Sequence, residues 1–265
     1  KIPVISSIIK RKIKKSLGWT NAKAIVNGAA FLPQSIIDWF QKFDVYILNG
    51  YGMTENCCVC SYLDTSDEKG VGSVGKPWDA VDVKIGKDGE IWNKSPYLLK
   101  EYYKNKELTS EVLKDGWFNT GDKGHIDSDG YLYITGRVKD IFKTSKGKYI
   151  EPSVLEAEFE KSNLFQQMCV VGLNLPQPIL LGVANDKTNE NKHDALKQAE
   201  IFLQKVNSDL DNYKKIKKIV FVKDEWSPEN GLTTPTLKIK RAKVDEVFSG
   251  KYENWYKSKK NILWE

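Results

Sequence analysis

The sequence predicts an α/β segment, then a β-rich segment, and finally a small α+β domain. Three changes of pattern along the 265 residues indicate this organisation. Near the N-terminus, amphipathic helical patterns alternate with short apolar runs typical of strands. From about residue 70, short strand-like runs are separated by turn residues, and beyond residue 137 helical patterns return between apolar runs. We therefore expect two domains, residues 1–137 and residues 138–265.

The first segment is expected to begin with a basic helix and to continue as a strand, a helix and a second strand. The strands are predicted over residues 22–27 and 45–49, and the helix, started by Pro33, over residues 35–43. The apolar run at residues 57–63 favours a third, buried strand. In the β-rich segment, residues 81–94 predict a hairpin, and a turn followed by a strand is expected within residues 127–137.

The second domain is predicted from apolar runs that alternate with helical patterns. Strands are expected over residues 168–173, 180–185 and 217–223. Helices are expected over residues 151–162 and 195–210, the latter being clearly amphipathic. The polar stretch at residues 185–194 is expected to be a loop.

Composition limits the classes of function. The net charge is +6, but acidic residues are interleaved with most of the basic ones and no nucleic-acid-binding motif is present, so we expect no nucleic acid partner. No apolar run is long enough to span a bilayer. With only two histidines, chemistry based on a Ser-His or Cys-His pair has few candidates. The expected compartment is the cytoplasm.

The basic residues near the N-terminus have two interpretations. They form either the solvated face of a helix or, together with an apolar stripe, a contact with an anionic membrane surface. The second interpretation predicts a protein that is peripheral to a membrane. The residues concerned are Lys10, Arg11, Lys12, Lys14 and Lys15, with Ile5, Ile8, Ile9, Ile13 and Leu17 as the stripe.

Two patterns resemble well-known motifs but lack their context. Cys57 and Cys60 form a CxxC, a pattern found at redox and zinc sites. Here it lies within the apolar run of the expected strand, and no second pair of ligands is nearby. We therefore interpret these cysteines as buried thiols. Residues 70–75 read GVGSVG, a match to the dinucleotide fingerprint and a near match to a phosphate-binding loop. Neither a strand before nor a helix after these glycines is expected, so they are interpreted as turn residues.

Four segments in a fixed order carry the chemical information. NGYGMTEN at residues 49–56 follows an apolar strand and offers Tyr51 for stacking, Thr54 as a donor to phosphate, and Glu55 as a ligand for a hard cation. DGWFNTGD at residues 115–122 ends in an acid, expected to be exposed in a tight turn. Lysines and turn glycines fill residues 136–156, and LTTPTLKIKR occupies residues 232–241.

In this order, the four segments resemble the adenylate-forming superfamily of acyl-CoA synthetases, luciferases and adenylation domains. The resemblance runs from about Gly28 to Lys243, and TTPTLKIKR, where relatives often carry a glycine before the lysine, resembles the long-chain fatty acyl-CoA synthetase branch. It implies that residues 1–137 are the α/β and β-rich C-terminal portion of a large AMP-binding domain. Residues 138–265 would be a small mobile α+β domain. The implied reaction uses ATP, Mg²⁺ and coenzyme A to convert a fatty acid through an acyl-adenylate to a thioester.

The resemblance also implies a role for individual residues. In the first domain, Tyr51 would stack on adenine beside Gly50, Thr54 would contact phosphate, and Glu55 would bind Mg²⁺. Lys238 would be the adenylation lysine, and Lys139 would lie at the hinge about which the small domain moves. The remaining residues would line the nucleotide and acyl pocket (Gly28, Ala29, Ala30), hold the ribose (Asp122, Arg137) and serve the thioester-forming state (Lys143, Gly147).

The family's loop for the β- and γ-phosphates should lie upstream of Gly28, where this sequence does not contain it. The chain is therefore expected to be a portion of a longer enzyme and inactive alone. Two alternatives stay open. One is an acyl-acyl carrier protein synthetase, which uses a carrier-bound thiol. The other is a non-catalytic nucleotide-binding or membrane-associated scaffold.

Overall fold

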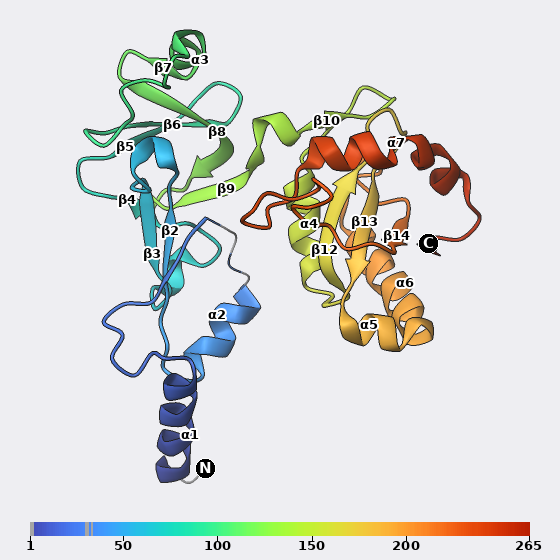
Figure 1. Cartoon of the computed structure of the whole chain (residues 1–265), viewed down its shortest axis with the longest axis horizontal. Helices are drawn as coiled ribbons and strands as arrows, with labels where there is room; N and C mark the ends of the chain where they lie inside the picture. Colours follow the sequence, from blue (N-terminus) through green and yellow to red (C-terminus); the bar gives the residue numbers. More distant parts are fainter. Residues whose placement is uncertain (1–2, 30–31, 33) are drawn as a thin grey trace. The chain divides into compact units, whose positions relative to one another are not determined.

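The computed structural model describes residues 3–29, 32 and 34–265, and the chain divides into two compact units. Unit 1 comprises Lys1–Thr135 and unit 2 comprises Gly136–Glu265 (Figure 1). The division lies just before the boundary expected at residues 137–138. Ala30 and Pro33 lie outside the described residues.

Unit 1 begins with two helices and a four-stranded sheet. In this sheet β1 and β2 are parallel, and β3 and β4 are added antiparallel, in the order β1-β2-β3-β4. A short 3-10 helix, η1 (Thr54–Asn56), connects β2 to β3. The helices are α1 (Pro3–Ser16) and α2 (Gln34–Gln41), and the strands are β1 (Val26–Asn27), β2 (Leu48–Tyr51), β3 (Ser61–Asp64) and β4 (Lys76–Pro77).

The second sheet of unit 1 is antiparallel and runs in the order β5-β6-β8-β7, with β9 also paired to β8. One apolar cluster contains Tyr51 and Cys60 from the region of the first sheet and Ile91 and Leu132 from the second. The two sheets therefore share a core. The elements are β5 (Asp82–Ile85), β6 (Glu90–Lys94), α3 (Lys106–Val112), β7 (Leu113–Lys114), β8 (Trp117–Ile126) and β9 (Leu132–Arg137).

Unit 2 is built on a mixed sheet in the order β12-β13-β14-β15 (Figure 1). Side chains alternate between its faces: Val170 and Phe221 pack with α4 and α6 in one cluster, and Val171 and Val220 pack with α7 in another. Because both faces are covered, the two inner strands of the sheet are apolar and buried throughout. The elements are β12 (Phe165–Val171), β13 (Ile179–Ala184), β14 (Ile219–Val222), β15 (Ile262–Trp264), α4 (Pro152–Glu160), α5 (Asp186–Glu190), α6 (Lys192–Ser208) and α7 (Arg241–Lys257).

Most of the predicted elements are present, with shifted ends. The basic helix is α1, the hairpin at residues 81–94 is β5–β6, and the expected elements of unit 2 correspond to α4, β12, β13, α6 and β14. Strand β1 is shorter than the strand predicted at residues 22–27, and strand β2 is displaced towards the C-terminus from the strand predicted at residues 45–49. Of the glycines at residues 70–75, Gly70 ends the 3-10 helix η2 (Glu68–Gly70), whereas Gly72 and Gly75 lie in the irregular segment before β4 with positive φ, consistent with turn residues.

Two predictions of local structure are wrong. Residues 57–63 are not one buried strand, because Cys57 and Cys58 are exposed in a turn with left-handed backbone angles of 53° and 60°, and β3 begins only at Ser61. Residues 185–194 are not a loop. Asn185 and Asn191 each accept a backbone N–H at a helix N-terminus, and these caps start α5 and α6.

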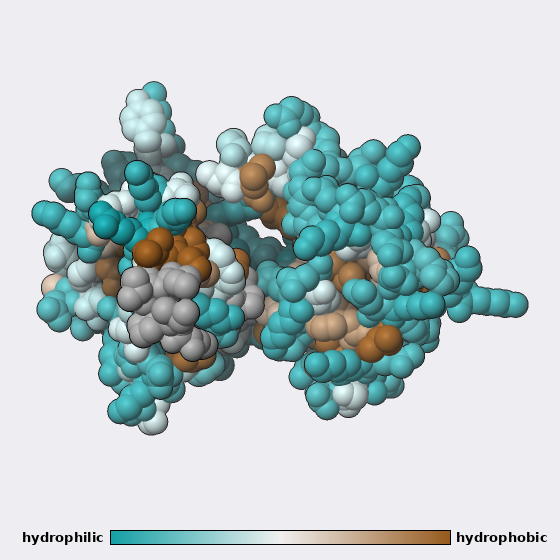
Figure 2. Space-filling view, turned by 90° about the horizontal axis from the view of Figure 1, so that it is seen from below, coloured by the Kyte–Doolittle hydropathy of each residue, from teal (hydrophilic) through white to brown (hydrophobic). Residues whose placement is uncertain are grey.

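Some of the basic side chains of α1 form contacts within unit 1. Lys10 Nζ lies 2.6 Å from Asp44 Oδ2, and Lys14 Nζ donates to the Asp44 carbonyl oxygen at 3.0 Å. Ile8 and Ile9 are exposed, and Figure 2, seen from the side where α1 begins, shows hydrophobic residues at the surface of this unit. Among the described residues, no helix is both long and apolar enough to cross a membrane.

The turn before β4 provides a stability test, with a matched control inside the same glycine-rich stretch. Gly72 and Gly75 both have φ of +82°, but a Cβ on Gly75 would lie 1.7 Å from the Tyr62 carbonyl oxygen, whereas a Cβ on Gly72 would meet only the Tyr133 ring at 4.0 Å. Gly72→Ala should cost about 1–2 kcal/mol for the left-handed backbone alone. Gly75→Ala should lower the free energy of unfolding by clearly more than Gly72→Ala does. Urea unfolding of both variants would measure the difference. Equal costs would contradict the β3–β4 pairing.

Candidate functional site

The first expected binding residues lie where two parallel strands end. Gly28 and Ala29 directly follow β1, and Gly50 and Tyr51 end the neighbouring strand β2. The two segments are close, since a Cβ on Gly28 would lie 3.6 Å from the Gly50 carbonyl oxygen. The carboxyl ends of adjacent parallel strands are a common place for ligands in α/β proteins. The fold therefore brings these two motifs together, and Ala30 lies outside the described residues.

A buried hydrogen bond joins the second motif to the third. The Tyr51 hydroxyl donates to Asp122 Oδ2 at 2.7 Å, and the two residues are only 9% and 7% exposed. Burial raises the pKa of Tyr51, and the Asp122 carboxylate raises it further. The phenol therefore stays protonated, and its ring is held in one orientation.

The expectation of an exposed Asp122 in a turn is wrong. Asp122 lies in the middle of β8, and its backbone N–H donates to Thr120 Oγ1 at 3.1 Å. The neighbouring Gly121 has a φ of +70°, and no atom lies within 4 Å of the position a Cβ would take there.

Thr54 and Glu55 lie on η1, directly after β2. Thr54 is exposed and Glu55 is half-buried. The Tyr102 hydroxyl donates to Glu55 Oε1 at 2.8 Å, and burial together with this carboxylate raises the pKa of Tyr102 to about 12. Tyr102 thus orients the Glu55 carboxylate. Nothing in the sequence around Tyr102 signalled this role.

The described residues contain no cluster of three or more acidic, histidine or cysteine side chains that would enclose a metal ion. A single carboxylate such as Glu55 nevertheless fits Mg²⁺, because this ion keeps several waters and takes its other ligands from substrate phosphates. Unit 1 therefore has the donor expected for a nucleotide-bound Mg²⁺, but not a cage for a resident metal.

In unit 2, Lys238 lies on a tight hairpin. The Leu237 N–H donates to the Thr234 carbonyl and the Thr234 N–H to the Lys238 carbonyl, each at 2.8 Å, and Thr233 bridges Ile239. Lys238 is exposed, and its backbone N–H also donates to Thr234 Oγ1 at 3.0 Å. The short loop thus fixes the backbone that carries the lysine.

This hairpin has an unusual residue at its tip. Leu237 has a φ of 61°, and its side chain is 66% exposed. Three-residue hairpin loops require a left-handed residue at their last position, and glycine takes it without strain. The leucine found here is disfavoured in that conformation.

The residues expected to serve the thioester-forming state share a second hairpin. Lys143 ends β10 (Phe142–Lys143), and Gly147, with a φ of +76°, lies in the turn before β11 (Tyr149–Ile150). A Cβ on Gly147 would lie 3.7 Å from the Lys143 side chain, and the Lys143 ammonium lies 5.6 Å from the Tyr149 ring centre. The fold therefore brings Lys143 and Gly147 together.

Arg137 and Lys139 lie at the start of unit 2. Arg137 ends β9, and Lys139 is the central residue of the 3-10 helix η3 (Val138–Asp140). Both are exposed. The site residues are thus divided, with Gly28 to Asp122 in unit 1 and Arg137 to Lys238 in unit 2.

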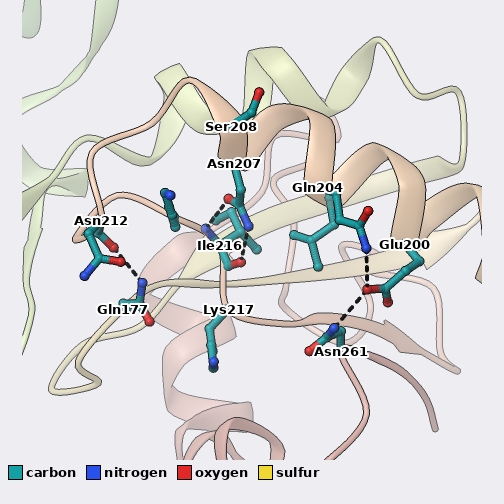
Figure 3. A pocket seen from close by; sticks show the side chains of 11 residues that line it. Gln177, Glu200, Gln204, Asn207, Ser208, Asn212, Ile216, Lys217 and Asn261 are labelled. Atoms are coloured by element: carbon teal, nitrogen blue, oxygen red, sulfur yellow. Dashed lines mark hydrogen bonds between the residues drawn. The ribbon is translucent and has the colours of Figure 1, made fainter.

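A polar depression of about 440 Å³ on unit 2 involves none of these residues (Figure 3). The side chains that line it form hydrogen bonds with one another and with the backbone of the loop that crosses it. Asn207 donates to the Ile216 carbonyl and accepts the Ile216 N–H, Gln177 donates to the Asn212 carbonyl, and Asn261 donates to Glu200. We interpret it as a structural feature that fixes the loop between α6 and β14.

Comparison with known proteins agrees with this arrangement. Residues 8–103 match the family described as AMP-binding enzyme, and residues 139–260 match the AMP-binding enzyme C-terminal domain. The two matched regions cover most of the chain and follow the expected order. The chain belongs to the adenylate-forming superfamily of AMP-binding enzymes.

Similar curated proteins indicate the branch of that superfamily. The chain is 30% identical to the long-chain-fatty-acid–CoA ligase FadD15 of Mycobacterium bovis, over 96% of this chain and 45% of that protein. It is 31% identical to long-chain-fatty-acid–CoA ligase 5 of Rattus norvegicus, over 95% and 41%. Both relatives are long-chain-fatty-acid–CoA ligases, and the chain spans less than half the length of each.

Solved structures support the fold. The anthranilate CoA ligase AuaEII in complex with anthranoyl-AMP superposes with a TM-score of 0.73 at 23% identity, covering 86% of this chain and 45% of that one. O-succinylbenzoate coenzyme A synthetase from Bacillus subtilis, in complex with AMP, gives 0.71 at 24%, covering 84% and 45%. The predicted fold class, part of an adenylate-forming domain followed by a small α+β domain, is confirmed.

The Tyr51–Asp122 hydrogen bond provides a test of the site in unit 1. Tyr51→Phe removes the donor to a buried carboxylate and should lower the free energy of unfolding by about 1.5–3 kcal/mol. Urea unfolding of the 265-residue chain would measure this. Tyr103→Phe, at a ring that is 86% exposed, is the matched control and should leave stability unchanged. If the two variants unfold at the same urea concentration, the bond does not hold the site together.

Proposed function

We propose that this chain belongs to an enzyme that activates a long-chain fatty acid with ATP and transfers the acyl group to coenzyme A. The main support is the Tyr51–Asp122 hydrogen bond, which joins two nucleotide-binding motifs that are far apart in the sequence. The names of the curated relatives support the substrate class. Because the chain covers less than half of those relatives, the activity is proposed for the full-length protein that carries these residues.

The proposed reaction has two steps. A carboxylate oxygen of the fatty acid attacks the α-phosphorus of ATP, the bond to the bridging oxygen breaks, and pyrophosphate leaves. The thiol sulfur of coenzyme A then attacks the acyl carbonyl carbon, AMP leaves with the electron pair of the broken C–O bond, and the thiol proton passes to solvent. The first step brings two anions together, so its rate depends on positioning and on neutralisation of charge.

We assign the nucleotide to unit 1. Gly28, Ala29, Gly50 and Tyr51 would contact the adenine, and Thr54 a phosphate. Asp122 would accept a hydrogen bond from a ribose hydroxyl. Ala30 would line the pocket together with Gly28 and Ala29.

Glu55, oriented by Tyr102, would hold the Mg²⁺ that accompanies ATP. When bound, Mg²⁺ neutralises charge on the phosphate oxygens. Glu55 itself contributes a single carboxylate ligand, which leaves the phosphates to complete the coordination.

We assign the second unit a role in both steps. Lys238 would place its ammonium between the carboxylate and the α-phosphate, and Arg137 would share the ribose. Lys143 and Gly147, on the separate hairpin, would serve the thiol step after the small domain has turned about Lys139. Adenylation and thioester formation would then depend on different faces of one domain.

Peripheral contact of α1 with an anionic membrane stays a prediction. The exposed Ile8 and Ile9 favour it. The bonds from Lys10 and Lys14 to Asp44 place part of the basic face within the fold instead.

Lys238→Ala in the full-length protein tests the proposal. Without this charge, acyl-adenylate formation should slow by about 10²–10³-fold, the usual effect of losing a group that acts in one transition state. Thioester formation from preformed acyl-adenylate and coenzyme A should stay near the normal rate, and Lys143→Ala should show the reverse. Pyrophosphate release and thioester formation would be measured separately.

Three results would redirect the proposal. Equal slowing of both steps by Lys238→Ala would reduce Lys238 to a structural lysine. Acyl transfer to a carrier protein but not to coenzyme A would identify an acyl-acyl carrier protein synthetase. Nucleotide binding without pyrophosphate release in the wild-type protein would identify a non-catalytic scaffold.

A further inference from the structure

Arg241 carries a positive charge at a helix N-terminus, where a positive charge is unfavourable. It is the first residue of α7 and follows Lys238 by three positions. A helix N-terminus favours acidic side chains, yet the first turn of α7 contains none. The guanidinium must therefore be stabilised by contacts outside the helix.

Those contacts clamp the start of α7 to the body of unit 2. Arg241 Nη1 and Nη2 donate to the two oxygens of Glu156 at 2.9 and 3.0 Å, and Nη1 also donates to the Val170 carbonyl at 2.7 Å. The Arg241 and Glu156 side chains are only 13% and 16% exposed. Glu156 Oε1 in turn accepts the Val170 N–H at 2.6 Å. The bidentate pair thus fixes α7 on α4 and β12.

One donor of this guanidinium is left over. Arg241 Nε is buried without a hydrogen-bond partner, and the carboxylate oxygen Asp140 Oδ2 lies 3.8 Å away. A hydrogen bond would require 2.7–3.2 Å, so the two groups are paired by charge but not bonded. A buried donor without an acceptor is unfavourable, and a small approach of Asp140 would satisfy it.

Asp140 is the last residue of η3, next to Lys139, and the Lys238 hairpin is attached to Arg241 almost rigidly. The Lys240 N–H donates to the Leu232 carbonyl at 2.8 Å, which fixes the residues between the hairpin and α7. Arg241 is therefore connected to the backbone that carries Lys238 through a hydrogen-bonded segment of only two residues.

We propose that Asp140 and Arg241 are positioning residues that couple the expected hinge segment to the Lys238 hairpin. The bond from Nε to Asp140 closes when Lys238 is placed for adenylation. This inference rests on the proposed function, because it assigns Asp140 and Arg241 to the adenylation step. Neither residue touches the reacting atoms.

Asp140→Ala in the full-length protein is the primary test, because Arg241→Ala would leave Glu156 buried without its partner and endanger folding. Asp140→Ala should slow acyl-adenylate formation by about tenfold, as expected for one lost hydrogen bond to a charged group. Thioester formation from preformed acyl-adenylate should change by less than about twofold, within the scatter of a surface substitution. Asp140→Asn keeps an acceptor oxygen for Nε and should restore most of the rate.

Combination with Lys238→Ala separates positioning from a general structural effect. If Asp140 acts through Lys238, Asp140→Ala should cause no further loss in the Lys238→Ala variant, so the two effects are non-additive. Glu246→Gln, which breaks the exposed Lys243–Glu246 pair on the same helix, is the control and should change neither step.

The outcomes distinguish the two proposals. If the wild-type protein releases no pyrophosphate, the proposed function fails. If Lys238→Ala leaves adenylate formation intact, the role assigned to Lys238 is wrong, and the coupling fails with it. If Lys238→Ala slows this step while Asp140→Ala does not, the proposed function stands and the coupling is wrong. Additive losses in the double variant, or equal slowing of both steps by Asp140→Ala, would also overturn the coupling.

Discussion

The hydrogen bond from Tyr51 to Asp122 is the contact on which the arrangement of unit 1 depends. Tyr51 ends a strand of the first sheet and Asp122 lies within the second, so the bond links the two sheets directly. Both groups are buried in or beside the core that the sheets share. A buried carboxylate needs such a donor, and the raised pKa of Tyr51 keeps the donor protonated. The same contact that satisfies the core therefore brings together two motifs that are expected to bind the nucleotide.

Unit 2 presents exposed, charged side chains on a rigid body. Its sheet is covered on both faces, and the lysines expected to act lie on short hairpins outside that sheet. Lys143 and Lys238 are each exposed while the backbone around them is held by hydrogen bonds. Precise placement of an ammonium group requires a fixed backbone, and these hairpins provide it.

Non-glycine residues with left-handed backbone angles occur at several places in this chain, and some of them lie close to the expected site residues. Leu237 takes a left-handed conformation immediately before Lys238, and Cys57 and Cys58 do so shortly after Thr54 and Glu55. Such conformations persist where the surrounding structure enforces them. At Leu237 the hairpin loop itself accounts for the conformation, since a three-residue loop ends in a left-handed residue.

The sequence alone determined the order of the motifs, the superfamily and most elements of unit 2, because these depend on neighbours within a few residues or on apolar runs that are unmistakable. It did not determine burial at the site. The thiols at Cys57 and Cys58 suggested a buried strand, but a turn that returns the Cys58 N–H to the Met53 carbonyl exposes them. Asp122 looked like an exposed turn residue, but its environment is set by Tyr51, 71 residues away. Local pattern fixes local structure, whereas which polar group is buried, and what satisfies it, is decided only when distant segments pack together.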